Sequence, residues 1–163
     1  MEYRLYFFVP YNISDIQKGV QSVHAAIQYT IQYAQDKDFK DFFINDKTVI
    51  ILNGGQTRFP RQDTEGQGSL NQIMDDLESN GVDFSFFCEP DLNHALSAIC
   101  FLADERVWDK DKYPDFEGEK EIPTFDGEKF SIYTSTAYKD WIDSVGGEKN
   151  VFLRELLKDK RLA

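Results

Sequence analysis

Residues 14–35, SDIQKGVQSVHAAIQYTIQYAQ, decide the fold class because they predict a long helix directly after an apolar strand. Ser14 and Gln17 have the S-x-x-Q spacing of a capping box, in which the hydroxyl and the amide satisfy free backbone N–H groups, so the helix should begin near Asp15. At about 100° per residue, one side of the helix collects six apolar side chains, those of Ile16, Val20, Val23, Ile27, Ile31 and Ala34. This periodicity predicts that this side faces the core.

Neutral polar side chains form a stripe along the border of that apolar side. The stripe recurs at near-helical spacing and consists of Gln17, Gln21, His24, Gln28 and Gln35. Lys18 projects about 100° away from Gln17. Taken alone, the stripe favours a structural interpretation, in which His24 lies at the edge of the core and the glutamines are solvated. The second interpretation is that these residues line a functional site.

Two predicted strands flank the helix and complete a βαβ unit. Tyr3–Val9 is apolar and aromatic on both faces, as in the buried middle of a sheet. Thr48–Leu52 is the second strand and leads into the turn Asn53-Gly54-Gly55. Units of this kind join parallel strands through a right-handed crossover. Asp38–Ile44 is expected to form a short amphipathic helix before the second strand.

The next segment predicts one more long helix and two more strands. Leu70–Ser79 carries apolar side chains at helical spacing, and Asn80-Gly81 ends it with residues that accept the left-handed conformation. Residues 82–88 and 96–102 are rich in aromatic and β-branched residues and flank a loop that contains proline. The order βαβαββ predicts a small mixed sheet of four strands.

Length and turn signals predict one domain with an extension. The chain has 163 residues and 41% hydrophobic content, which suits a single domain. Residues 1–103 are expected to form the α/β domain, and residues 104–163 an extension packed on it. The extension begins as an acidic, irregular segment and ends, over residues 135–162, as two short helices broken at Gly146-Gly147. Its expected role is packing against the sheet, a contact in a homodimer, or a cover over the site.

The segment Gln21-Ser-Val-His24-Ala25-Ala26 resembles the first helix of the second (archaeal and eukaryotic type) family of peptidyl-tRNA hydrolases. That family carries a Lys-x-x-x-Gln-x-x-His-Ala pattern after its first strand. In this alignment the family's functional lysine falls on Gln17, and the nearest lysine is Lys18, one residue further on. The resemblance covers the first two-thirds of the chain and implies a three-layer α/β/α fold. The segments KG-x-Q-x-x-HA and EPDL also resemble, more loosely, small phage proteins without an assigned activity.

The family also has a functional aspartate in the loop after its third strand and a functional threonine near the start of the next strand. In the region of EPDLNHAL, residues 89–96, the resemblance places the acid at Glu89 or Asp91 and the hydroxyl at Ser97. It implies that the acid orients a water molecule for ester cleavage, while Lys18 and Ser97 stabilise the developing charge. The residues expected to bind or position the substrate are Gln17, Gln21, His24, Arg58 and Arg61.

The resemblance therefore implies hydrolysis of the ester that joins a peptide to tRNA, with no cofactor and no metal. A second hypothesis is a family member that lost the lysine and binds a protein partner without catalysis. A third is a nucleotide- or small-molecule-binding module, which has in its favour the glycine-rich loop of residues 54–69. That loop contains no G-x-x-x-x-G-K-[ST] phosphate motif.

Charge is distributed unevenly along the chain. The net charge of −11 opposes a nucleic-acid partner, because phosphate binding needs clustered lysine and arginine. Residues 63–128 carry four Lys/Arg and eighteen Asp/Glu, a net charge of −14, whereas residues 1–62 have +1 and residues 129–163 have +2. The acidic residues of segment 63–128 either keep the protein soluble or form a surface that binds a basic partner. The cations that could still meet tRNA are Lys18, Arg58 and Arg61.

Signals for membranes, export and metal binding are weak. No apolar run approaches the roughly 20 residues of a membrane span, and MEYRLYFFVPY at the N-terminus lacks the pattern of a secretory signal. A cytoplasmic protein without a membrane partner is therefore expected. Cys88 and Cys100 should be free thiols in neighbouring strands. No C-x-x-C or H-E-x-x-H spacing occurs, so no zinc site is expected.

Overall fold

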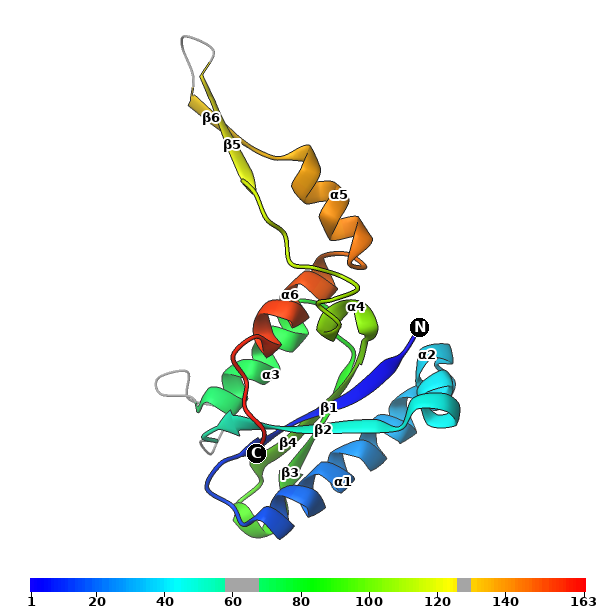
Figure 1. The fold of residues 1–163 in the computed structure, drawn as a ribbon. Helices are drawn as coiled ribbons and strands as arrows, with labels where there is room; N and C mark the ends of the chain where they lie inside the picture. Colours follow the sequence, from blue (N-terminus) through cyan, green and yellow to red (C-terminus); the bar gives the residue numbers. More distant parts are fainter. Residues whose placement is uncertain (58–67, 126–129) are drawn as a thin grey trace.

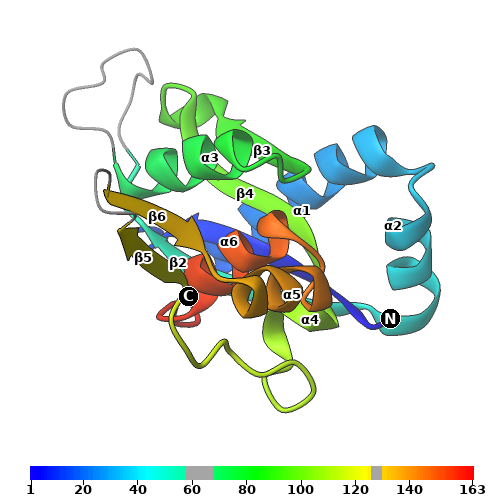
Figure 2. The same ribbon diagram turned by 90° about the horizontal axis from the view of Figure 1, so that it is seen from above.

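The computed structural model describes residues 1–57, 68–125 and 130–163, and its centre is a mixed four-stranded sheet with helices on both faces (Figures 1 and 2). The strands in spatial order are β2 (Thr48–Gly55), β1 (Tyr3–Pro10), β4 (Ala95–Asp104) and β3 (Phe84–Glu89). β1 is parallel to β2, and β4 is antiparallel to both β1 and β3. The predicted α/β class and mixed four-stranded sheet are therefore confirmed.

Most of the helices begin and end close to the residues that the sequence indicates. The helices are α1 (Asp15–Tyr33), α2 (Lys37–Asp41), α3 (Ser69–Ser79), α4 (Glu105–Trp108), α5 (Thr136–Ser144) and α6 (Glu148–Leu157). The capping box is present, because the backbone N–H of Ser14 donates to the Gln17 side chain and the N–H of Gln17 donates to the Ser14 hydroxyl. The expected short helix after α1 is divided: α2 is followed by a π-helical turn, Phe42–Asp46.

The segment expected to be irregular contains a hairpin that the sequence did not indicate. β5 (Glu121–Phe125) and β6 (Phe130–Thr134) pair antiparallel and project away from the body of the molecule (Figure 1). Pro123 within β5 argued against a strand, since proline is confined to edges and bulges of sheets. In a sheet of two strands every strand is an edge, so this proline is tolerated.

The two faces of the sheet support two separate apolar cores. Along β1, Leu5, Phe7 and Val9 point towards α1, while Tyr6 and Phe8 point towards α3, α4 and α6. This alternation follows from the period of two in a strand. α4 and α6 therefore belong to the core of the sheet through Val107 and Leu153. The chain end lies along β2, where the backbone N–H of Asn53 donates to Arg161 and that of Ala163 to Ile51.

α1 packs on the sheet with the side opposite to the predicted one. Its buried residues are Gln21, Ser22, Ala25 and Tyr29, whereas Ile16, Val20, Val23, Ile27 and Ile31 are all exposed. The prediction that the apolar side of this helix faces the core is wrong.

None of the described helices combines the length and hydropathy that a membrane crossing requires.

The polar residues of the sheet explain which side of α1 is buried. Ser85 and Ser97 are buried in β3 and β4, where a hydroxyl without a partner would be costly. The Ser85 hydroxyl donates to the backbone oxygen of Ala25 at 2.7 Å, and the Ser97 hydroxyl donates to Gln21 Oε1, also at 2.7 Å. Small residues on this side let the helix lie close enough for both bonds.

Candidate functional site

A pocket lies at the carboxyl ends of the two parallel strands, where ligands commonly bind in open α/β sheets. Its volume is about 200 Å³. It is lined by Pro10 at the end of β1, by Gln17 and Gln21 of α1, by Glu89 at the end of β3 and by Ser97 of β4, together with Asn12, Thr57 and Asp91. We refer to it as the Glu89 pocket. The structure thus brings together five of the residues that the sequence singled out, namely Gln17, Gln21, Glu89, Asp91 and Ser97.

Three of these side chains form a continuous chain of hydrogen bonds. The Ser97 hydroxyl donates to Gln21 Oε1 at 2.7 Å, and Gln21 Nε2 donates to Glu89 Oε2 at 2.6 Å. Gln21 is 6% exposed and Ser97 is 1% exposed, so both are fixed by packing as well as by bonding. The amide of Gln21 therefore holds the Glu89 carboxylate in one orientation at the mouth of the pocket.

A short turn places Glu89 at this position. Glu89 precedes a 3₁₀ turn, Pro90–Leu92, and its Oε1 accepts from the backbone N–H of Asp91 at 3.3 Å. Asn93 and His94 follow with positive φ angles of 53° and 58°. This left-handed conformation is uncommon for residues other than glycine, although asparagine tolerates it best. The turn closes when the N–H of His94 donates to the carbonyl of Glu89 at 3.0 Å.

Hydrogen bonding keeps Glu89 ionised. The bond from Gln21 is the largest effect that lowers the pKa of this carboxyl, followed by the bond from the Asp91 N–H, while the charge of His24 adds a smaller effect in the same direction. A carboxyl with a lowered pKa contributes to stability above its ordinary pKa, and this contribution is lost as the pH falls through the lowered value. At neutral pH the pocket therefore presents a fixed negative charge.

Lys18 lies apart from this pocket. Its Nζ is 3.0 Å from Asp15 Oδ1, within the first turn of α1, and its side chain is 15% exposed. Gln17, the position that aligns with the family's lysine, does line the pocket. The one-residue shift seen in the sequence therefore corresponds to a real difference in direction, because neighbouring helical side chains diverge by about 100°.

The remaining predicted residues occupy other places. The ring of His24 stacks on that of Phe87, with a distance of 4.4 Å between their centroids and an interplanar angle of 16°. Arg58 and Arg61 lie outside the described residues. Asn12 and Thr57 line the pocket but were missed by the sequence interpretation. Their position just beyond the ends of two parallel strands is the signal that could have indicated them.

The part of the Glu89 pocket lining that the structure describes has a negative balance of charge. Among the described residues its lining includes two carboxylates, Glu89 and Asp91, and no lysine or arginine. Asn12 and Thr57 supply neutral hydrogen-bonding groups. Such a lining is suited to a ligand that donates hydrogen bonds or carries a positive charge, and it disfavours a phosphate.

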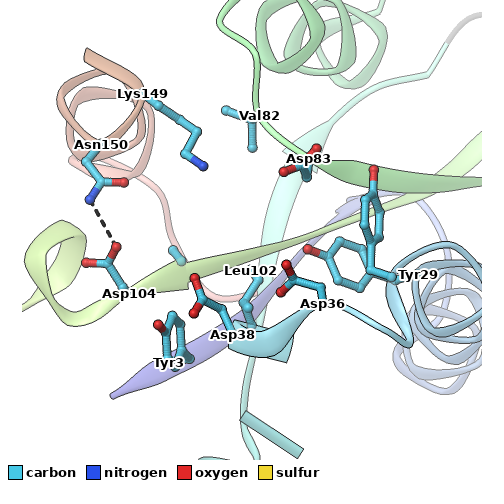
Figure 3. A pocket seen from close by; sticks show the side chains of 12 residues that line it. Tyr3, Tyr29, Asp36, Asp38, Val82, Asp83, Leu102, Asp104, Lys149 and Asn150 are labelled. Carbon is cyan, nitrogen blue, oxygen red and sulfur yellow. Dashed lines mark hydrogen bonds between the residues drawn. The ribbon is translucent and has the colours of Figure 1, made fainter. Parts of the chain in front are cut away.

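A second pocket, at the opposite end of the sheet, is more acidic (Figure 3). Asp36, Asp38, Asp83 and Asp104 surround it, and Lys149 reaches in from α6. Two of these acidic side chains have structural roles. Asp36 caps α2 by accepting from Phe39 N–H, and Asp104 accepts from Arg106 and from Asn150 Nδ2. Although burial alone would raise the pKa of Asp104, these hydrogen bonds outweigh it and lower that pKa.

Neither pocket offers a metal-binding arrangement. No group of three or more His, Cys, Asp or Glu side chains among the described residues is placed to hold a metal ion. No disulfide joins Cys88 and Cys100, and burial raises the pKa of Cys100 above its ordinary range.

The chain was compared with protein-family models, with curated proteins and with solved structures. None of the three comparisons found a match. The chemistry of the Glu89 pocket is therefore the basis for inferring a function.

Proposed function

We propose that the chain acts by binding rather than by catalysis, and that the Glu89 pocket takes a cationic group from a protein partner. The group has the chemistry of an arginine guanidinium or a lysine ammonium. The observation that carries this proposal is the fixed Glu89 carboxylate in a lining whose described residues include no opposing cation.

The hydrogen-bonding capacity of Glu89 supports this ligand class. Its Oε2 accepts from Gln21 and its Oε1 accepts from the Asp91 N–H. A carboxylate has about four acceptor sites, so each oxygen keeps capacity for one more donor. A guanidinium can meet both oxygens with a pair of parallel N–H groups. Asp91, in the same lining, would add to the attraction of a positive charge.

The size of the pocket limits what can enter. Small-molecule sites commonly measure about 300–1,000 Å³, and the Glu89 pocket is smaller, at about 200 Å³. It therefore suits the end of one side chain better than a nucleotide or a cofactor. A partner protein would supply the rest of the binding surface.

Titration with N-acetylarginine amide, followed by nuclear magnetic resonance, tests this proposal. We expect the side-chain amide signals of Gln21 to shift, because Gln21 Nε2 donates to the carboxylate that the ligand would approach. The neutral citrulline analogue has nearly the same shape and should bind more weakly. Equal shifts with both ligands would show that charge recognition is absent.

Glu89→Gln should weaken binding of N-acetylarginine amide by at least about tenfold, since a hydrogen bond to a charged group is worth about 1.5–3 kcal/mol. The substitution removes the charge and keeps the size. Glu119→Gln is the matched control, because Glu119 is an exposed acid that does not belong to the described lining of the pocket. Wild-type affinity in Glu89→Gln would exclude Glu89 as the binding group.

A second proposal is ester hydrolysis on peptidyl-tRNA. The observation that favours it is the hydrogen-bonded chain of Ser97, Gln21 and Glu89, which joins three residues that the family resemblance singled out. Glu89 would orient the attacking water, and the neutral groups of Asn12 and Thr57 would face the developing oxyanion. Lys18 contributes no charge to the described lining, so this mechanism would rely on neutral donors.

A further inference from the structure

The outer side of α1 carries a continuous row of exposed aliphatic side chains, which we call the α1 stripe. Its members and their exposed fractions are Ile16 (81%), Val20 (46%), Val23 (58%), Ile27 (51%) and Ile31 (70%). Together they expose on the order of 500 Å² of apolar surface, which is near the upper end for the largest patch on a monomeric protein. The helix contacts β1, β3 and β4 with its other side and lies at the outside of the molecule (Figure 1).

Charged residues are confined to one end of this surface. Residues 19–35 contain no Asp, Glu, Lys or Arg, although 29% of the chain is charged. The charges of α1 are confined to its first turn, at Asp15 and Lys18. Depletion of charge around exposed apolar residues is typical of the centre of a protein interface.

A hollow in the stripe has the arrangement that receives a side chain from another helix. It is lined by Ile16, Gly19, Val20 and Val23, together with Asp15 and His24. The first four positions follow i, i+3, i+4 and i+7, which is the four-residue hole of helix packing in coiled coils. A Cβ atom placed on Gly19 would meet nothing within 4 Å. The absence of a side chain at Gly19 therefore leaves room for an aliphatic side chain of a second helix.

We propose that the α1 stripe is the contact surface of a homodimer, in which two copies of α1 pack antiparallel about a two-fold axis between Val23 and His24. The stripe suits this symmetry because its residues are nearly palindromic about that point. Ile16 faces Ile31 of the partner subunit, and Val20 faces Ile27 of the partner subunit. The partner's Ile27 then enters the hollow beside Gly19. By symmetry, Ile27 of the first subunit enters the same hollow of the partner subunit.

The area is sufficient for a specific dimer. Pairing of two stripes would bury about 1,000 Å² in total, which is the size from which a specific interface becomes plausible. The exposed glutamines beside the stripe, Gln28 and Gln32, would add area and a neutral polar rim.

Charge favours a second copy over other macromolecules. A helix that binds lipid surfaces or nucleic acid has lysine and arginine along its polar border, whereas glutamines and His24 form the border of the α1 stripe. In the antiparallel pair, the charged first turns lie at opposite ends, so Asp15 does not meet its symmetry mate. Two copies, each with a net charge of −11, repel each other at long range. Dimerisation should therefore strengthen with added salt, because the interface itself contains no ion pairs.

Sedimentation equilibrium over a wide range of concentrations tests the proposal. We expect the wild type to approach twice the chain mass of 18.9 kDa as its concentration rises. Val23→Glu places two carboxylates beside the two-fold axis and should raise the dissociation constant on the order of a hundredfold. Val23→Lys should do the same. An equimolar mixture of Val23→Glu and Val23→Lys should form dimers again, because the two opposite charges then face each other across the axis.

Two further variants separate dimerisation from folding. Gly19→Leu fills the hollow with a residue that favours helix more than glycine does, so it should weaken the dimer while the circular dichroism spectrum stays unchanged. Ile132→Glu is the control, because Ile132 is 56% exposed but lies on β6, outside the stripe. A wild type that remains at 18.9 kDa at every concentration would overturn the proposal, even if it captured vesicles or another protein. Failure of the mixed Val23 variants to associate would equally overturn the two-fold arrangement.

Discussion

Phe101→Ala is expected to lower the free energy of unfolding by about 3–5 kcal/mol, the usual cost of removing a large buried aromatic ring. Phe101 is fully buried in β4, with its ring stacked on those of Tyr6 and Phe8 at centroid distances of 5.6 and 6.0 Å. The substitution leaves a cavity between β4 and the helices on that face. Because small domains have about 5–15 kcal/mol of stability in total, the variant should lose a large share of its stability and unfold at a much lower urea concentration.

Urea denaturation followed by circular dichroism measures this effect. Phe86→Ala is the matched control, since Phe86 lies on the neighbouring strand β3 and is 42% exposed. Its expected cost is below about 1 kcal/mol, because most changes at exposed sites are small. Equal losses for the two variants would show that Phe101 does not hold the core together as described.

Arg154→Ala is expected to cost about 3 kcal/mol, because it leaves two carbonyl oxygens without their donor and leaves the Asp115 carboxylate with Lys110 alone. Arg154 belongs to α6 and is 3% exposed. Its guanidinium donates to the carbonyl of Arg106, to the carbonyl of Tyr113 at 2.7 Å and to Asp115 Oδ1 at 2.6 Å. The Arg154 side chain thus holds residues 106–115 against α6. In the variant, this segment should detach from α6 as stability is lost.

Hydrogen exchange and limited proteolysis distinguish this release from general destabilisation. In Arg154→Ala the backbone between α4 and β5 should exchange and be cut faster than the strands of the sheet. Lys158→Ala is the control, because Lys158 directly follows α6 and is an exposed cation that pairs with Glu155 across 3.8 Å. Unchanged protection of residues 106–115 in Arg154→Ala would contradict this role.

Local signals in the sequence were sufficient to locate most elements of the fold. Ser14 and Gln17 mark the start of α1 through a capping box that spans four residues. Asn80-Gly81 marks the end of α3, again through residues that are close in sequence. Gly146 and Gly147, with φ angles of 95° and 94°, separate α5 from α6. Each of these signals depends on neighbours in the chain, and a single sequence contains all of that information.

The orientation of α1 could not be read from the same local signals. Periodicity placed Val23 and Ile27 in the core, because it treats an apolar side as a buried side. The deciding contacts are distant in sequence: Ser85 bonds to Ala25 and Ser97 bonds to Gln21, over separations of 60 and 76 residues. Two serines inside otherwise apolar strands were the available sign that the covering helix must offer polar partners.

The candidate site shows the same division between local and distant information. The family resemblance pointed to Gln21, to Glu89 or Asp91, and to Ser97, and the structure joins Gln21, Glu89 and Ser97 by hydrogen bonds. The direction of Lys18 is local information, because it follows from the one-residue shift along the helix and from the pairing with Asp15. The lining by Thr57 depends on the parallel pairing of β1 and β2, which a motif aligned along the chain does not contain.

We propose that the Glu89 pocket binds a cationic group and does not cleave tRNA esters. The most direct measurement is the release of a labelled acyl group from N-acetyl-aminoacyl-tRNA by the wild type, with Glu89→Gln as the comparison. The negative lining and the position of Lys18 predict that the wild type releases no more label than the blank. Release by the wild type that disappears in Glu89→Gln would contradict the claim and would establish the pocket as the active site of an ester hydrolase.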